Sequence, residues 1–172
     1  SVVEINAKQA NRSKFTAAGG INPVTGRLSI GAPIKKNKGS FLISVRSTYS
    51  DWILNLIESE ELNNTAVNFA DGIFNANYDI NEKNKINATA YYSFDKINFA
   101  GNNKYNYENQ GLSLSWKHFY KQNLSTDFNV ILSKYKSDEE DLNDDTDIFA
   151  QNFAMNHNEL KIITEYIPKP EH

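Results

Sequence analysis

The chain has 172 residues, no cysteine, a formal net charge of -3 and a mean hydropathy of -0.59. This length suits one domain with a core, and the lack of cysteine excludes disulfides and thiolate chemistry. No stretch approaches the ~20 apolar residues of a membrane helix, so neither such a helix nor a signal peptide is expected. The acidic balance does not favour nucleic acid as a partner, because nucleic acids usually bind strongly basic surfaces.

Apolar and polar residues alternate with a period of two in successive stretches of the chain, which predicts β-strands. The alternating runs are 25–34, 40–49, 74–80, 86–94, 111–120, 124–135 and 158–167. In the first of them, Leu28, Ile30 and Ala32 share one face and Arg27 and Ser29 the other. We expect about eight antiparallel strands after residue 13, many of them longer than the ~5–6 residues usual in soluble sheets.

The connections between these runs alternate in length and charge. Short turns rich in lysine are expected at 35–39, 81–85 and 121–123, and long loops, two of them strongly acidic, at 49–66, 96–107 and 137–148. Within the first long loop, residues 49–62 have helical spacing. Trp52 there either contacts a ligand or a partner at the outer face or packs the loop onto itself, and packing is the favoured interpretation. Long strands with tight turns at one end and long loops at the other are typical of a transmembrane β-barrel.

The two faces of the predicted sheet favour the same interpretation. The apolar face mixes aromatic residues with small ones such as Ala88 and Ala90, which lipid tolerates but a densely packed protein core does not. Two alternatives remain open. One is a soluble β-sandwich that binds carbohydrate through exposed Tyr and Trp, and the other is a complete small eight-stranded outer-membrane barrel.

The segment "GRLSIGAPIKKNKGSFLISVRSTYSDWIL" resembles the start of the barrel in TonB-dependent outer-membrane receptors of the Bacteroidetes type. The segments "NFADGIFNANYDINEKNKINATAYYSFDKINF", "GLSLSWKHFYKQNLSTDFNVILSKY" and "LKIITEYIPKPEH" continue that pattern in the same order. The resemblance covers residues 13–172 and rests on the ordered series rather than on one motif.

The resemblance implies an all-β fragment, an antiparallel transmembrane β-barrel segment of about eight strands within a larger barrel. Residues 1–12 would be the end of the plug domain and a linker, and 13–172 the first strands of the barrel. The implied function is active nutrient uptake, with no enzymatic activity and no cofactor. The implied partners are outer-membrane lipid, the protein's own plug domain, the TonB complex through a more N-terminal part and a surface lipoprotein.

The candidate functional residues lie on the polar face, which would line the lumen or contact the plug. Counting by parity, they are Arg46, Asp71, Asn75, Asn77, Asp79, Asn87, Lys117 and Asp127. No metal site is predicted, because the three histidines are scattered and the acidic run at 138–147 lacks the order and the central glycine of an EF-hand. A solvated loop is the favoured interpretation of that acidic run.

Overall fold

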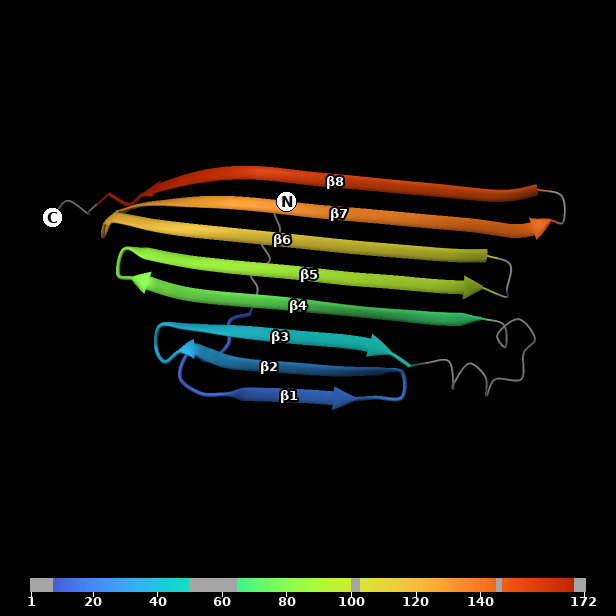
Figure 1. The fold of residues 1–172 in the computed structure, drawn as a ribbon, viewed down its shortest axis with the longest axis horizontal. Coiled ribbons are helices and arrows are strands. Elements are labelled where there is room, and N and C mark those ends of the chain that lie inside the picture. The colour runs from blue at the N-terminus through green and yellow to red at the C-terminus, as the bar shows by residue number, and fades with distance from the viewer. Residues whose placement is uncertain (1–7, 50–64, 100–102, 145–146, 169–172) are drawn as a thin grey trace.

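The computed structural model describes residues 8–49, 65–99, 103–144 and 147–168. These residues form a single antiparallel sheet of eight strands (Figure 1). The strands are β1 (Thr16–Ile21), β2 (Thr25–Lys35), β3 (Gly39–Thr48), β4 (Ala66–Asn81), β5 (Asn84–Phe99), β6 (Asn103–Lys121), β7 (Leu124–Asp144) and β8 (Asp147–Tyr166). The all-β antiparallel architecture and the number of strands expected from the alternation are therefore confirmed.

Each strand pairs with the next along the chain, so the sheet is a meander with the order β1 to β8. The turns between β2 and β3, β4 and β5, and β6 and β7 all lie at one end of the sheet (Figure 1). Asn37 in the first of these turns has a φ of 61°, a conformation that asparagine tolerates better than most residues. The short turns are thus placed as the sequence predicts.

The strands at the far end of the sheet run further than expected. The predicted loop at 96–107 is wrong, because β5 continues to Phe99 and β6 begins at Asn103. The predicted loop at 137–148 is also wrong, because β7 continues to Asp144 and β8 begins at Asp147. The acidic stretch 138–144 therefore belongs to the end of β7 and lengthens the hairpin that β7 forms with β8.

Cross-strand pairing explains how such a polar sequence remains extended. Lys104 in β6 lies directly opposite Glu140 in β7, and their side chains form an ion pair at 3.5 Å. Tyr107, three residues further along β6, donates a hydrogen bond to Glu139 in β7 at 3.2 Å. Backbone pairing satisfies the amides regardless of side-chain polarity, and opposite charges across the pair add a little stability.

The sheet is a single layer over the described residues. No apolar side chain in this part of the chain is buried, and large apolar residues such as Leu114, Leu112 and Leu132 are 41–50% exposed. A β-sandwich needs two sheets packed face to face, and the described strands form one. β1 and β8 lie at opposite edges of the strand order, so these strands do not close on each other as a complete small barrel would require.

Two expectations fall outside the described residues. The helical spacing at 49–62, with Trp52, lies almost wholly within 50–64. Most of the segment expected to end a plug domain lies within 1–7, while residues 8–10 are described and form no strand. No helix in the described ranges is long and apolar enough to cross a membrane.

Candidate functional site: the two faces of the sheet

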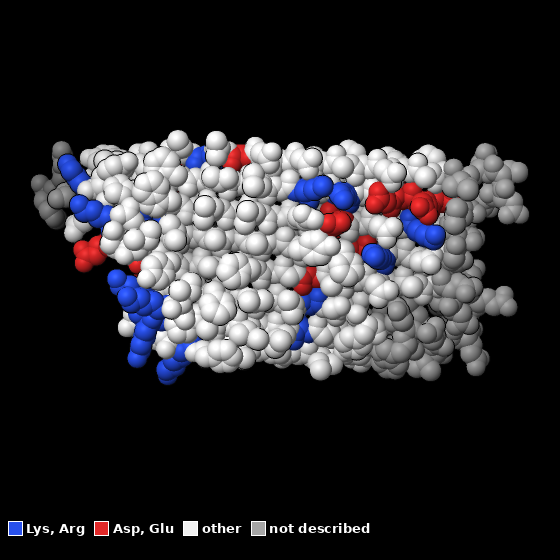
Figure 2. All heavy atoms as spheres, viewed as in Figure 1, with Lys and Arg blue, Asp and Glu red and all other residues white. Residues whose placement is uncertain are grey.

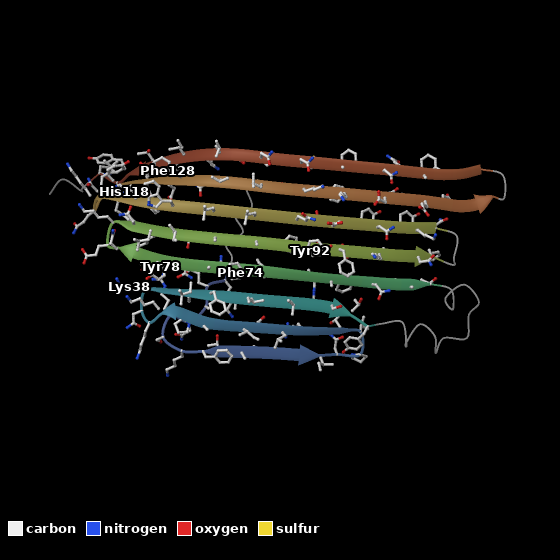
Figure 3. The ribbon with its side chains drawn as sticks, viewed as in Figure 1. Lys38, Phe74, Tyr78, Tyr92, His118 and Phe128 are labelled. Atoms are coloured by element: carbon white, nitrogen blue, oxygen red, sulfur yellow. The ribbon has the colours of Figure 1, made fainter. Side chains whose placement is uncertain are left out.

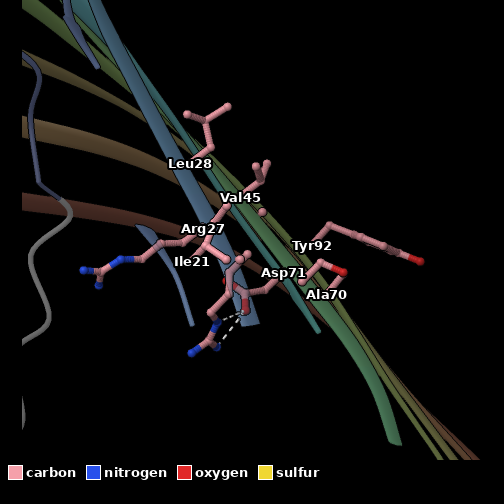
Figure 4. Close-up of a pocket in the computed structure, with 11 residues that line it drawn as sticks. Ile21, Arg27, Leu28, Val45, Ala70, Asp71 and Tyr92 are labelled. Carbon is pink, nitrogen blue, oxygen red and sulfur yellow. Dashed lines mark hydrogen bonds and ion pairs between the residues drawn. The ribbon is translucent and has the colours of Figure 1, made fainter. Parts of the chain in front are cut away.

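The pairing register fixes which side chains share a face. Arg27, Arg46 and Asp71 lie side by side on β2, β3 and β4, and the neighbouring row is Leu28, Val45 and Gly72. Because successive residues of a strand point to opposite sides, these two rows lie on opposite faces. Figure 4 shows Arg27 on one side of the sheet and Leu28 and Val45 on the other. We call the side of the first row the polar face and the side of the second row the apolar face.

All eight candidate residues lie on the polar face. The register pairs Arg46 with Asp71, Asn77 with Asn87, and Lys117 with Asp127. Asn75 and Asp79 share the face of Asn77, because they are two residues away from it in β4. The structure thus brings together residues that the parity of the sequence assigned to one side. Trp52 lies outside the described residues.

Ion pairs cross the strands of the polar face. Arg46 donates from Nε and Nη2 to Oδ2 of Asp71, each at 2.7 Å. Lys117 is shared between Asp127 at 3.1 Å and Glu165 at 3.5 Å, and so links β6, β7 and β8. The paired charges are partly exposed, so each contributes little stability by itself but leaves the face charged and hydrated.

The most buried side chains of the described residues are polar and lie where β3 meets β4. Ser40 is 0% exposed and Asn77 2%, and the Asn77 amide donates to the Ser40 hydroxyl at 3.0 Å. Asn75, 7% exposed, donates to Thr89 at 2.9 Å. The carbonyl oxygens of the Asn75 and Asn77 side chains are buried without a protein hydrogen bond. Such groups ordinarily bind water or a polar partner.

The segment before β1 covers this buried cluster. Arg12 forms an ion pair with Asp79, with Nη1 2.6 Å from Oδ2. The Ser40 hydroxyl donates to the Ala10 carbonyl at 2.9 Å, and the Asn37 amide donates to the Arg12 carbonyl at 2.9 Å. These contacts hold residues 8–14 against the polar face near the short turns.

The close approach of this segment depends on a glycine. A Cβ added to Gly31 in β2 would lie 2.7 Å from the Cβ of Ala10 and 2.9 Å from the hydroxyl of Thr16. Any larger residue at Gly31 would therefore push the segment away from the sheet. Of these contact residues, only Asp79 and Asn77 were predicted. Arg12 and Ser40 were missed, because their contacts join distant parts of the chain that alternation does not relate.

The apolar face is uncovered across the sheet. Its larger side chains are Leu28, Ile30, Phe41, Ile43, Val45, Phe74, Tyr78, Ile86, Tyr92, Phe94, Leu112, Leu114, Trp116, Phe128, Val130, Leu132, Leu160 and Ile162. In β6 and β7 they lie within 112–120 and 124–132, and we call this zone across the strands the apolar band. Figure 2 shows charged side chains gathered towards both ends of this face, with a broad and mostly uncharged region between them.

Aromatic side chains occupy the middle of the apolar band and the end of it that lies nearer the short turns. Trp116 stacks on Phe128 with ring centroids 5.2 Å apart, and His118 contacts Tyr120 edge-to-face at 4.6 Å. Figure 3 shows His118, Phe128 and Tyr78 near the end of the sheet that carries Lys38, and Tyr92 further from that end, near the middle of the sheet's length. Aromatic rings with a polar edge suit the boundary between an apolar medium and water.

The Asn84 side chain holds two of these rings. The Trp116 indole donates to Asn84 Oδ1 at 3.0 Å, and Nδ1 of His118 lies 2.8 Å from the same oxygen. The indole N–H can only donate, so its bond fixes which Asn84 atom is the oxygen. Because that oxygen can only accept, His118 must carry a proton on Nδ1 to bond to it.

The described residues contain no group of acidic, histidine or cysteine side chains that could hold a metal ion. On the extended hairpin, burial and the hydrogen bond to Glu139 raise the pKa of Tyr107 above its usual value, which keeps the phenol protonated. The polar face offers hydrogen bonds and ion pairs between neighbouring strands.

Comparison with family models, with curated proteins and with solved structures finds no match to this chain. The class that the fold defines is an all-β protein, a single antiparallel meander sheet with one apolar and one polar face.

Proposed function

We propose that the chain forms part of the barrel wall of a TonB-dependent outer-membrane receptor that takes up a scarce nutrient. The observation that carries the proposal is the uncovered apolar band on one face of a sheet whose other face is polar and ion-paired. A lipid-facing strand needs ~9–11 residues to cross the hydrocarbon layer, and the segments 112–120 in β6 and 124–132 in β7 have this length.

The strand ends beyond the apolar band also fit a sheet that crosses a membrane. Beyond the apolar band, the apolar face carries charged and amide side chains such as Lys96, Glu108 and Lys136. Strands that leave the membrane have water on both faces and no longer need apolar residues. In this proposal the short turns face the periplasm and the extended hairpins face the outside of the cell.

The polar face would line the lumen and hold the plug. The contacts of Arg12, Ala10 and Asp79 support this role, since they anchor the segment that leads towards the N-terminus on the lumen side. In such a receptor, ligand binds to plug and extracellular loops, and TonB transmits inner-membrane energy to displace the plug. The step breaks hydrogen bonds and ion pairs and no covalent bonds, so we propose no enzymatic activity.

Localisation is tested by fractionating the cell envelope of the source organism. We expect the protein in the outer-membrane fraction, retained after a sodium carbonate wash and released only by detergent. Release by carbonate, or recovery in the soluble fraction without detergent, would overturn the proposal.

Transport is tested by comparing a deletion of the gene with depletion of TonB in the same organism. We expect at least one scarce nutrient whose accumulation falls in both strains and returns when the gene is restored. If every nutrient lost on TonB depletion is still accumulated by the deletion strain, the receptor function is rejected even for an outer-membrane protein.

A further inference from the structure

A hollow of about 550 Å³ lies where the apolar band ends, over β5 to β8. Its wall on the side of the band is Leu112, Leu132 and Tyr92, which are 41–49% exposed. Its wall on the side of the extended hairpins is Gln110, Lys134 and Asn156. One hollow thus joins an apolar surface to amides and a cation.

The charge of Lys134 is not compensated by its neighbours. On the apolar face, Lys134 lies directly between Gln110 in β6 and Asn156 in β8, which are both neutral amides. Glu108, the nearest acidic position along β6, accepts a hydrogen bond from Gln110. Lys134 forms no ion pair with any residue in the part of the chain that the structure describes.

Lys136 provides a contrast two residues further along the same strand and face. It also forms no ion pair with a described residue, but it lies directly opposite Glu108, so a carboxylate faces its positive charge across the strand pair. Lys104, further out, is neutralised by Glu140. At the end of the apolar band towards the extended hairpins, Lys134 is thus the first cation on the apolar face of β6 and β7, and it has no opposite charge directly across from it.

We propose that this hollow binds one anionic phospholipid, with its phosphate on Lys134 and its acyl chain along Leu112 and Leu132. The inference rests on the proposed function, because it needs the apolar band to lie in a bilayer. A lipid matches both walls at once: its headgroup lies at the level where the apolar residues stop, and anionic headgroups attract basic residues at that level. Gln110 and Asn156 supply amide groups for the headgroup oxygens.

The experiment uses the protein as its gene encodes it, inserted in bilayers of phosphatidylcholine with one fifth phosphatidylglycerol. Flotation first reports insertion, and the fraction of motionally restricted spin-labelled lipid then reports selectivity. We expect phosphatidylglycerol to be preferred over phosphatidylcholine, and Lys134→Gln to weaken that preference about fivefold. Lys136→Gln, the matched control, is expected to change it less than about twofold, because Glu108 already opposes that charge.

The outcomes separate the inference from the function on which it rests. Failure of the wild-type protein to insert would overturn both. Insertion without a preference for phosphatidylglycerol would overturn the lipid site alone. An equal loss of that preference in Lys134→Gln and Lys136→Gln would do the same. Millimolar inorganic phosphate should leave the preference unchanged, and displacement of the lipid by phosphate would replace the lipid with a free anion as the ligand.

Discussion

Arg12 and Asp79, 67 residues apart, form a 2.6 Å ion pair that fastens the segment before β1 to the polar face of β4. The pair lies beside the buried side chains of Ser40 and Asn77, which are hydrogen-bonded to each other. The Ser40 hydroxyl also donates a hydrogen bond to the backbone carbonyl of Ala10 in the segment. The anchor therefore combines a partly exposed ion pair with buried hydrogen bonds.

Breaking the ion pair should loosen the segment without unfolding the sheet. Because both side chains are partly exposed, at 34% and 26%, the pair should contribute no more than about 1 kcal/mol. We expect Asp79→Asn to accelerate tryptic cleavage after Lys14 by up to about fivefold. Asp127→Asn is the control, since it removes a carboxylate from Lys117 and not from the segment. Equal acceleration in both variants would contradict the assignment of the anchor to Asp79.

The approach of the segment to β2 should depend on Gly31. We expect Gly31→Ala to cost about 1–3 kcal/mol or to displace the segment, because the new Cβ overlaps Ala10. Hydrogen exchange at the Asn37 amide, which donates to the Arg12 carbonyl, reports the displacement.

Gly111→Ala is the matched control for that substitution. Gly111 also lies on the polar face, and its nearest neighbour to an added Cβ is the Cβ of Tyr91 at 3.9 Å, an ordinary contact. We expect exchange at Asn37 to be unchanged in this variant. Unchanged exchange in Gly31→Ala as well would show that the segment does not lie against β2.

The two faces should differ in their tolerance of charge. Leu114 lies in the middle of the apolar band and Ser115 follows it on the polar face. In folding titrations with lipid vesicles, we expect Leu114→Arg to cost about 2–4 kcal/mol and Ser115→Arg to cost little, because a lipid-facing charge loses its hydration and a lumen-facing one keeps it. Similar costs at both positions would argue that neither side chain faces lipid.

The Tyr107 phenol should titrate above its usual range. Burial and the bond to Glu139 raise its pKa, so the neutral form is favoured in the folded state. The resulting stabilisation is present below the unfolded pKa of about 10 and is lost as pH rises through the higher folded value. Carbon NMR of the tyrosine ring should show Glu139→Gln lowering that pKa towards normal. No change in this variant would mean that burial alone sets the value.

The alternation predicted the faces of the sheet because the side-chain period of a strand is fixed at two. Arg46, Asp71 and Lys117 could be assigned to one side without knowing their partners, since no bulge interrupts the register between them and the neighbouring candidates. Lipid as the apolar partner remains a prediction from the same pattern.

The ends of the strands could not be predicted in the same way. The acidic run at 138–147 predicts a loop within 137–148, but composition distinguishes a loop from a strand only where one face is buried. Past the apolar band, β6 and β7 stay paired through their backbones and through contacts such as that of Lys104 with Glu140. The ion pair of Arg12 with Asp79 could not be predicted from alternation either, because it joins the residues next to β1 to the end of β4.

The central claim, that the apolar face lies in lipid, is tested most directly by nitroxide scanning along β6 in the membrane-inserted protein. The natural chain segment has no cysteine, so single cysteines can be placed at successive positions from 104 to 120. We predict that accessibility to oxygen peaks at Leu112, Leu114 and Trp116, that accessibility to a water-soluble nickel complex peaks at Ser113 and Ser115, and that the oxygen peaks disappear at 104–108. Equal nickel accessibility at Leu114 and Ser115 would contradict the account.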